Sequence, residues 1–261
     1  MYWTFAKLAF QERLIYKVNT WLYILYAMLD LAIQFSVWSA LYGVRGDVGG
    51  VTLTEMMTYV LLSTGVSILT ESHVGNTLAG KVEDGSIEAD FVRPVSLKYY
   101  LFCDTFGSTT YIFLFTFVPV AVFAMFLVPV CPPVSAAQLI IFMVSVILGV
   151  LLAHYIHYTL GLLAFWFKRS IYVNWFLGAF FTLFGGATVP LWFYPDFLRR
   201  IAEVLPFRFV IYEPVCIYLG KTDLHSGMQV LLMQIAWIAI LHLLERFIWS
   251  RAQRVVTIQG G

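Results

Sequence analysis

Long apolar runs alternate with short polar connections along the 261 residues, and this pattern predicts a bundle of membrane-spanning helices. A spanning helix needs about 20 mostly apolar residues. Six segments approach this length: Trp21–Tyr42, Leu53–Thr70, a stretch within Thr105–Val128, Ala136–Phe167, Ile171–Trp192 and Met228–Ile248. The fifth of these is interrupted by Gly185-Gly186 and Pro190. We therefore expect an all-α, polytopic membrane protein with six transmembrane helices and a single domain over residues 1–261.

Two further segments have helical patterns but are not expected to span. Residues 1–19 mix aromatic side chains with Lys7, Arg13 and Lys17, which is typical of a helix lying in the membrane interface. In Tyr194–Asp223, apolar residues recur at helical spacing until a proline stops the helix, and a short broken apolar stretch follows. This predicts a re-entrant or interfacial helical hairpin, partly inserted as an outer gate, with these candidate gate residues: Pro206, Phe207, Glu213 and Pro214.

A charged segment, His73–Lys98, lies between two long apolar runs. Its acids and bases are Glu83, Asp84, Glu88, Asp90, Lys81, Arg93 and Lys98. Hydrocarbon cannot solvate such a segment, so it must lie in water or against another protein. Leu78 with Val82, and Ile87 with Phe91, are spaced four residues apart on either side of Gly85. This spacing predicts two short amphipathic helices with an apolar contact face, and the alternative is an ordinary solvated loop.

Composition supports a membrane protein, because 61% of the residues are hydrophobic and only 12% are charged. Soluble domains carry about 25% charged residues. The net charge of +1 gives no reason to expect nucleic acid as a partner. Cys103, Cys131 and Cys216 are too widely spaced to predict a disulfide framework or a zinc site. Glu12 and Arg13 interrupt the apolar pattern of the N-terminus, which does not resemble a cleavable signal.

The distribution of basic residues predicts the orientation. With six spans, eleven of the 16 lysine and arginine residues fall on the side that holds both termini and the charged segment. Basic residues concentrate on the cytoplasmic side of membrane proteins. We therefore expect both termini in the cytoplasm and the 194–223 hairpin on the outer side.

A few polar residues inside the spans are candidates for chemistry. Asp30 lies nine residues into the first span, roughly 13 Å deep, close to the membrane midplane, with Gln34 one turn further. A functional and a structural role are equally open for this acid, and both residues are candidates for a translocation path. His154 and His157 share one helix face, but the absence of a nearby third ligand favours structural histidines over a metal or haem site.

A tripeptide, Gly220-Lys221-Thr222, looks like the end of a phosphate-binding loop. The motif requires a glycine five positions earlier, and that position is Val215. We therefore expect no nucleotide site in this chain.

Two stretches together with the order of elements resemble the permease subunits of type-2 ABC exporters. GKVEDGSIEADFVRPVS is similar to that family's G-x-(I/L)-x-x-x-L-x-R-P pattern through Gly85, Ile87, Phe91, Arg93 and Pro94, with Phe91 standing where leucine is common. The block around the hairpin resembles the family's outer pattern through Pro190, Leu191, Pro195, Leu198, Ile201, Leu205, Pro206, Phe207, Pro214 and Gly220. The branch that exports drugs, antibiotics and peptides is the most similar.

The resemblance implies an ATP-driven exporter subunit in a bacterial plasma membrane. It implies that the charged segment is a coupling helix for a cytosolic ATP-binding cassette ATPase, through Leu78, Val82, Gly85, Ile87, Phe91, Arg93 and Pro94. ATP and Mg²⁺ would bind that ATPase, and this chain would hold no cofactor and catalyse no reaction. A second permease subunit, identical or homologous, and membrane lipid are the other implied partners.

Two other function classes stay open. An ion-coupled carrier or passive channel would use Asp30 and the membrane histidines as a proton relay, but it does not account for an amphipathic cytoplasmic segment. An intramembrane enzyme is less favoured, because the sequence lacks paired acids and an HExxH motif. The chemistry of the substrate beyond an amphiphilic character cannot be read from the sequence.

Overall fold

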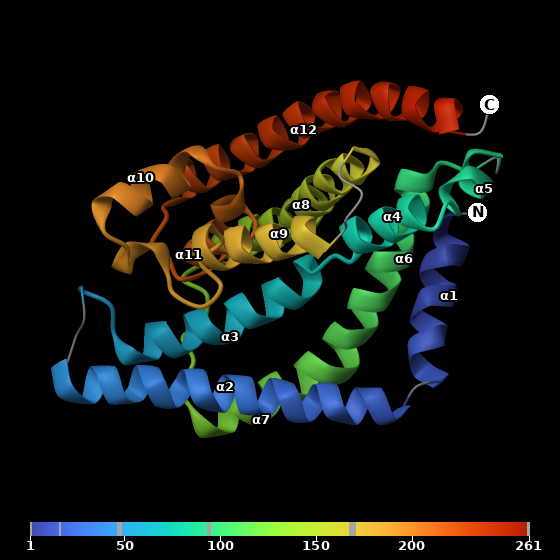
Figure 1. Ribbon diagram of the computed structural model, residues 1–261. Coiled ribbons are helices and arrows are strands. Elements are labelled where there is room, and N and C mark those ends of the chain that lie inside the picture. The colour runs from blue at the N-terminus through green and yellow to red at the C-terminus, as the bar shows by residue number, and fades with distance from the viewer. Residues whose placement is uncertain (1, 16, 46–48, 93–94, 167–170, 260–261) are drawn as a thin grey trace.

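The computed structural model describes residues 2–15, 17–45, 49–92, 95–166 and 171–259, which are almost entirely helical (Figure 1). These residues contain no β-strand, so the expected all-α class is confirmed. The α-helices are α1 (Tyr2–Ile15), α2 (Lys17–Arg45), α3 (Leu53–Thr70), α4 (Val74–Glu83), α5 (Ile87–Val92), α6 (Leu97–Ile112), α7 (Val118–Leu127), α8 (Ala136–Gly161), α9 (Ile171–Phe184), α10 (Asp196–Val204), α11 (Tyr212–Tyr218) and α12 (Leu224–Gln259). Short 3-10 or π turns are η1 (Phe113–Phe117), η2 (Leu162–Phe165), η3 (Leu191–Phe193) and η4 (Phe207–Phe209).

Five helical segments in the described part of the chain are long and apolar enough to cross a membrane: Val18–Gly43, Leu53–Glu83, Leu97–Leu127, Ala136–Phe165 and Leu224–Ala252. They contain the first, second, third and sixth of the expected spans and cover the fourth as far as Phe165. The third continues from α6 into α7 through the π turn η1, directly before Pro119. Proline has no backbone N–H to complete the regular helical ladder, which accounts for the wider turn at this point.

The expected span Ile171–Trp192 has different bounds in the structure. α9 is only 14 residues long and ends at Phe184. Gly186 follows with a φ of +75°, a left-handed conformation that glycine adopts at little cost and that stops a helix. The interruption expected at Gly185-Gly186 is therefore present, and Trp192 lies in the separate turn η3, which follows Pro190.

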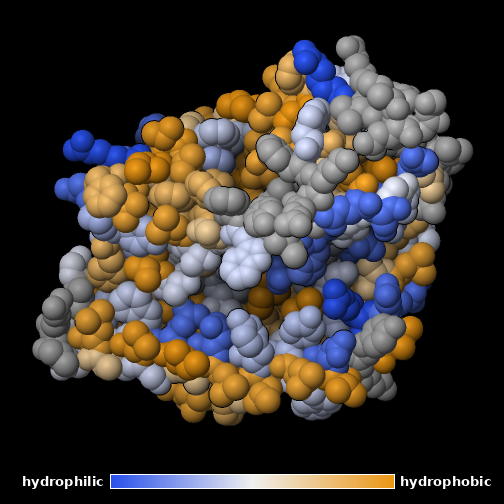
Figure 2. All heavy atoms as spheres, viewed as in Figure 1, coloured by the Kyte–Doolittle hydropathy of each residue, from blue (hydrophilic) through white to orange (hydrophobic). Residues whose placement is uncertain are grey.

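Helices α2, α3, α8, α9 and α12 run in roughly the same direction across Figure 1, whereas α1 and α6 lie at a steep angle to α2. The N-terminus, the C-terminus, α4 and α5 lie at one end of the molecule, and α10 and α11 lie at the other. We call these the terminal end and the hairpin end. Apolar side chains cover the surface over α2, and polar side chains gather near α4 and α5 (Figure 2). This distribution suits a bundle whose middle is surrounded by lipid.

Two apolar clusters form the interior. The larger one lies between the long helices and the hairpin, with Tyr59, Phe209 and Ile217 among its fully buried side chains. The smaller one lies at the terminal end and joins α4 and α5 to the ends of α6, α8 and α12. The second cluster therefore attaches the charged segment to three different spans.

Helix α1 packs along α6, and the closest approach is at Gly107. A Cβ atom at this position would lie 2.1 Å from the carbonyl oxygen of Ala6. Only glycine permits this separation, because the opposing atom belongs to the backbone and cannot rotate away. The placement of α1 therefore depends on glycine, which has no side chain, at position 107 of α6.

We predict that Gly107→Ala lowers the stability of the detergent-solubilised protein by about 1–3 kcal/mol, the usual cost of forcing an extra group into a packed contact. Gly43→Ala is the matched control, because a Cβ there meets no atom within 4 Å. Alanine should be neutral or stabilising at that helical position. Equal melting temperatures for the two variants in thermal unfolding would contradict the close contact between α1 and α6.

Candidate functional site

The charged segment folds into two short helices at the terminal end, which we call the foot (Val74–Val92). Gly85, with a φ of +76°, separates α4 from α5. The turn is held by a hydrogen bond from the backbone N–H of Ser86 to Asp84, and hydrogen bonds from Ser86 lower the pKa of that carboxyl. Lys81 donates to Asp90 at 2.6 Å and ties the two helices together. The two-helix geometry expected from the sequence is therefore present.

The apolar face of the foot packs against this same chain. Leu78 is fully buried and Ile87 is 3% exposed, both in the cluster that contains Leu162 of η2. Gly75 and Gly161 let α4 approach α8 closely, since a Cβ on Gly161 would lie 2.9 Å from the Cα of Gly75. In this conformation Leu78 and Ile87 are covered by the chain itself, and their contact with an ATPase stays a prediction.

The outward side of the foot is polar. Its exposed residues are Asn76, Thr77, Glu83, Asp84, Gly85, Ser86, Glu88 and Ala89, and Val82 is half-buried. The side chain of Phe91, together with Arg93 and Pro94, lies outside the described residues. A partner that meets the foot in this conformation meets mainly carboxylates, hydroxyls and amides.

A buried ion pair next to the foot was not expected from the sequence. Lys98, at the start of α6, donates to Glu245 of α12 at 2.6 Å, and the two side chains are only 10% and 6% exposed. His242 Nδ1 lies 3.4 Å from the ammonium and 3.3 Å from the carboxylate, and the ammonium also lies 4.9 Å from the ring centre of Tyr155.

Lys98 belongs to the charged segment that was expected from the sequence to lie in water or against another protein, and the structure buries it against its own chain. Its partner Glu245 is 147 positions away, so no local pattern could identify the pair. The available signal was topological, because the six spans expected from the sequence would bring the start of α6 and the end of α12 to one side of the membrane. An acid and a base at these two helix ends were candidates for pairing.

At the hairpin end, the four candidate gate residues are brought together by contact between η4 and α11. Pro206, Phe207 and Pro214 are buried, and the ring of Phe207 packs 5.1 Å from that of Phe181 in α9. Glu213 is also buried, and its Oε1 lies 3.5 Å from Arg208 Nε. Burial raises the pKa of Glu213, Arg208 opposes this shift, and Glu203 adds to it.

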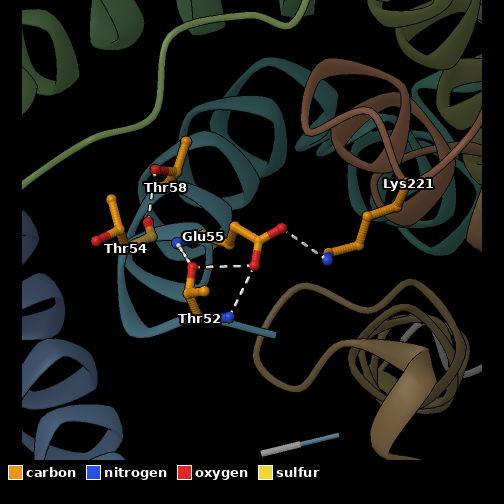
Figure 3. A network of polar contacts seen from close by, with 5 residues as sticks. All are labelled: Thr52, Thr54, Glu55, Thr58 and Lys221. Carbon is orange, nitrogen blue, oxygen red and sulfur yellow. Dashed lines mark hydrogen bonds and ion pairs between the residues drawn. The ribbon is translucent and has the colours of Figure 1, made fainter. Parts of the chain in front are cut away.

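A polar network fastens the hairpin to the start of α3 (Figure 3). Thr52 and Glu55 form a reciprocal capping box in which the Thr52 N–H donates to Glu55 at 2.7 Å. The other oxygen of that carboxylate accepts from Lys221 at 2.9 Å. The lysine of the false phosphate-loop motif therefore has a structural partner.

Asp30 accepts a hydrogen bond from the Gln34 amide at 2.8 Å within α2, and both side chains are half-buried. The Gln34 carbonyl oxygen is buried with no hydrogen-bond partner among the described residues. The two residues thus form a pair on one helix, and their role in a translocation path stays a prediction.

The two histidines of α8 lie among aromatic rings. His157 Nδ1 donates to the carbonyl of Ala153 at 2.8 Å, and its ring stacks on Phe181. His154 packs edge-on against Phe102 at 4.9 Å, and neither of its nitrogens has a hydrogen-bond partner within the described ranges. In that same part of the chain, no group of three or more His, Cys, Asp or Glu residues could hold a metal ion.

Comparison of the sequence with known protein families identifies one family. A family model described as ABC-2 family transporter protein matches residues 28–260, which is most of the chain. No individual curated protein matches the sequence. The matched region includes the foot, the hairpin, four of the five candidate spans in full and the first span from residue 28 onward. The chain therefore belongs to the ABC-2 transporter family and is a multi-pass membrane permease of an ABC transporter.

Proposed function

We propose that this permease is the membrane subunit of an ATP-driven exporter for an amphiphilic substrate, such as a drug, an antibiotic, a peptide or a lipid-like molecule. The observation that carries the proposal is the foot, whose inner face is buried against the spans while its outer face is exposed and polar. Such an element can receive force from a cytosolic protein and pass it to the bundle. ATP and Mg²⁺ bind the partner ATPase, and this chain holds no cofactor of its own.

The foot acts as a lever because it is packed against several spans. Its buried residues Leu78 and Ile87 share one cluster with the ends of α6, α8 and α12. The Lys98–Glu245 pair adds a charged link between the residue that follows the foot and the last span. Closure of two ATPases on ATP binding would displace the foot, and this link would carry the displacement to α12.

A sixth crossing is part of the proposal. Both termini lie at one end, while α8 ends at that end and α12 begins at the other (Figure 1). The chain must therefore return between residues 166 and 224, and α9 with the segment up to η3 provides that return. The excess of basic residues assigns the terminal end to the cytoplasm of a bacterial cell and the hairpin to the outer side.

A second permease, identical or homologous, completes the pathway. A wide apolar groove of about 810 Å³ runs along α9, with Gly178, Ala179 and Thr182 in its floor. Small residues permit close helix approach in lipid. Ala32 and Ser36 on α2 are exposed as well, whereas Gly185 is buried within its own chain. Lipid covers the remaining apolar surface.

Topology can be tested by labelling with a membrane-impermeant maleimide after the three native cysteines are replaced. Arg200 is exposed on α10 and Glu88 is exposed on the foot. We expect Arg200→Cys to react in intact cells and Glu88→Cys to react only after permeabilisation. Reaction of both from outside would contradict the six-span arrangement, and the reverse pattern would invert the orientation.

Docking on the foot can be tested by charge reversal. Glu88→Arg should weaken co-purification of the ATPase about tenfold, because a reversed charge at a complementary interface costs at least 1–2 kcal/mol. Glu12→Arg, an exposed acid on α1, makes the same change in net charge away from the foot. An ATPase that binds both variants like the parent would argue against docking at this face. A preparation that transports without any ATPase would instead favour the carrier or channel.

The charged link can be tested by removing one partner or both. Lys98→Met should destabilise the protein by about 3–5 kcal/mol, since it leaves Glu245 buried without its lysine. Lys98→Met combined with Glu245→Leu should recover most of that stability, because no buried charge remains. We expect this double variant to hydrolyse ATP with its partner but to transport less per ATP in vesicles. Full coupling in a stable double variant would reduce the pair to a packing role.

A further inference from the structure

A cavity of about 390 Å³ opens at the hairpin end, outside the features that the proposed function uses. Its walls come from η3, α10, η4 and α11, with Lys221 at the margin. These elements follow one another along the chain, the contact of Arg208 with Glu213 joins η4 to α11, and the contact of Lys221 with Glu55 joins the hairpin to α3. The cavity is therefore enclosed by tethered elements.

Positive charge predominates in the lining. Arg199, Arg208 and Lys221 face two carboxylates, those of Glu203 and Glu213. The Arg208–Glu213 contact is long, at 3.5 Å, and burial raises the pKa of Glu213, so this carboxyl compensates its arginine weakly. Lys221 pairs with Glu55, and Arg199 pairs with Asp196 only at the surface, where such contacts contribute little.

Two buried donors beside the cavity lack a hydrogen-bond acceptor within the described part of the chain. Arg208 Nε and the indole Nε1 of Trp192 are both buried, and neither has an acceptor among the described residues. Buried donors in native proteins nearly always have a partner. A site with several cationic side chains and unmatched donors is suited to a ligand that carries several acceptor oxygens and a negative charge.

The surface beside the cavity is apolar. On α10, Arg199 lines the cavity, while Phe197, Ile201 and Val204 are exposed. An amphiphile could place its polar head in the cavity and its chains along this apolar face. The cavity itself has room for a headgroup only.

We propose that this cavity binds the phosphate headgroup of an amphiphile at the outer face of the permease. Arg199 and Arg208 would neutralise the phosphate, since their carboxylate contacts are exposed or long, and arginine is well matched to phosphate oxygens because it can donate two parallel hydrogen bonds. The site does not depend on the export reaction, because binding can be measured without ATP or transport. Failure of export and failure of this site are therefore separate outcomes.

The test uses the full-length protein in a nonionic detergent and measures affinity by native mass spectrometry with three probes. Dioctanoyl phosphatidylglycerol carries both phosphate and chains, dioctanoylglycerol carries chains alone, and glycerol phosphate carries phosphate alone. We expect the phospholipid to bind most tightly. Equal binding of dioctanoylglycerol would overturn phosphate recognition, and equal binding of glycerol phosphate would overturn the lipid source of the headgroup.

Two neighbouring arginines on α10 provide a matched pair of variants. Arg199 lines the cavity and Arg200 does not, although both are exposed. Arg199→Gln should weaken phospholipid binding about tenfold through the loss of one charge-assisted contact, and Arg199→Lys should restore part of it. Arg200→Gln should bind like the parent. Equal losses in both glutamine variants, or no loss in Arg199→Gln, would overturn the proposal.

Discussion

The cost of placing an unpaired polar group in hydrocarbon is the constraint on which this structure depends. It requires backbone groups to be satisfied within each segment, which favours helices over any open sheet. It also accounts for the position of the closest ion pairs among the described residues, which are Lys81–Asp90 and Lys98–Glu245 at the terminal end and Lys221–Glu55 at the hairpin end. Between them, neutral groups make the buried polar contacts. Gln234 of α12 is fully buried and donates to the carbonyls of Ser145 and Phe209 at 2.9 and 2.7 Å.

Helices α8 and α12 connect the two ends. The foot packs on α8 and η2 at one end, and α11 packs on α8 at the other. Gly149 of α8 lies so close to the hairpin that a Cβ would be 3.0 Å from the carbonyl oxygen of Val210. α12 contacts the foot region through Glu245 and the hairpin through Gln234. A movement that begins at the foot can therefore reach the hairpin through two helices, without a separate transmitting element.

The sequence predicted the features that depend on neighbouring residues, and it did not predict the contacts between residues that are far apart in the chain. Apolar runs located five of the long helices, and Gly85 correctly marked the turn of the foot, because length and backbone conformation are local properties. The same reasoning identified an apolar face at Leu78 and Ile87, but amphipathicity does not say whether a partner or the chain itself covers that face. Their burial depends on Gly75 meeting Gly161, and the pairing of Lys98 depends on Glu245. The local sequence contains no pattern that identifies either contact.

The charged regions around Lys98 and around Arg208 differ in how many of their hydrogen-bond donors have acceptors within the protein. This difference distinguishes a structural contact at Lys98 from the binding site that we propose at Arg208. Lys98 has a carboxylate at 2.6 Å, a histidine nitrogen at 3.4 Å and an aromatic face nearby, so its charge is compensated within the protein. Arg208 has a carboxylate only at 3.5 Å, and its buried Nε lacks an acceptor among the described residues. Both regions adjoin a cavity, but an added anion would compete with Glu245 at the terminal end. At the hairpin end an added anion would supply hydrogen-bond acceptors for donors such as Arg208 Nε that lack one among the described residues. We therefore assign the ligand to the hairpin end.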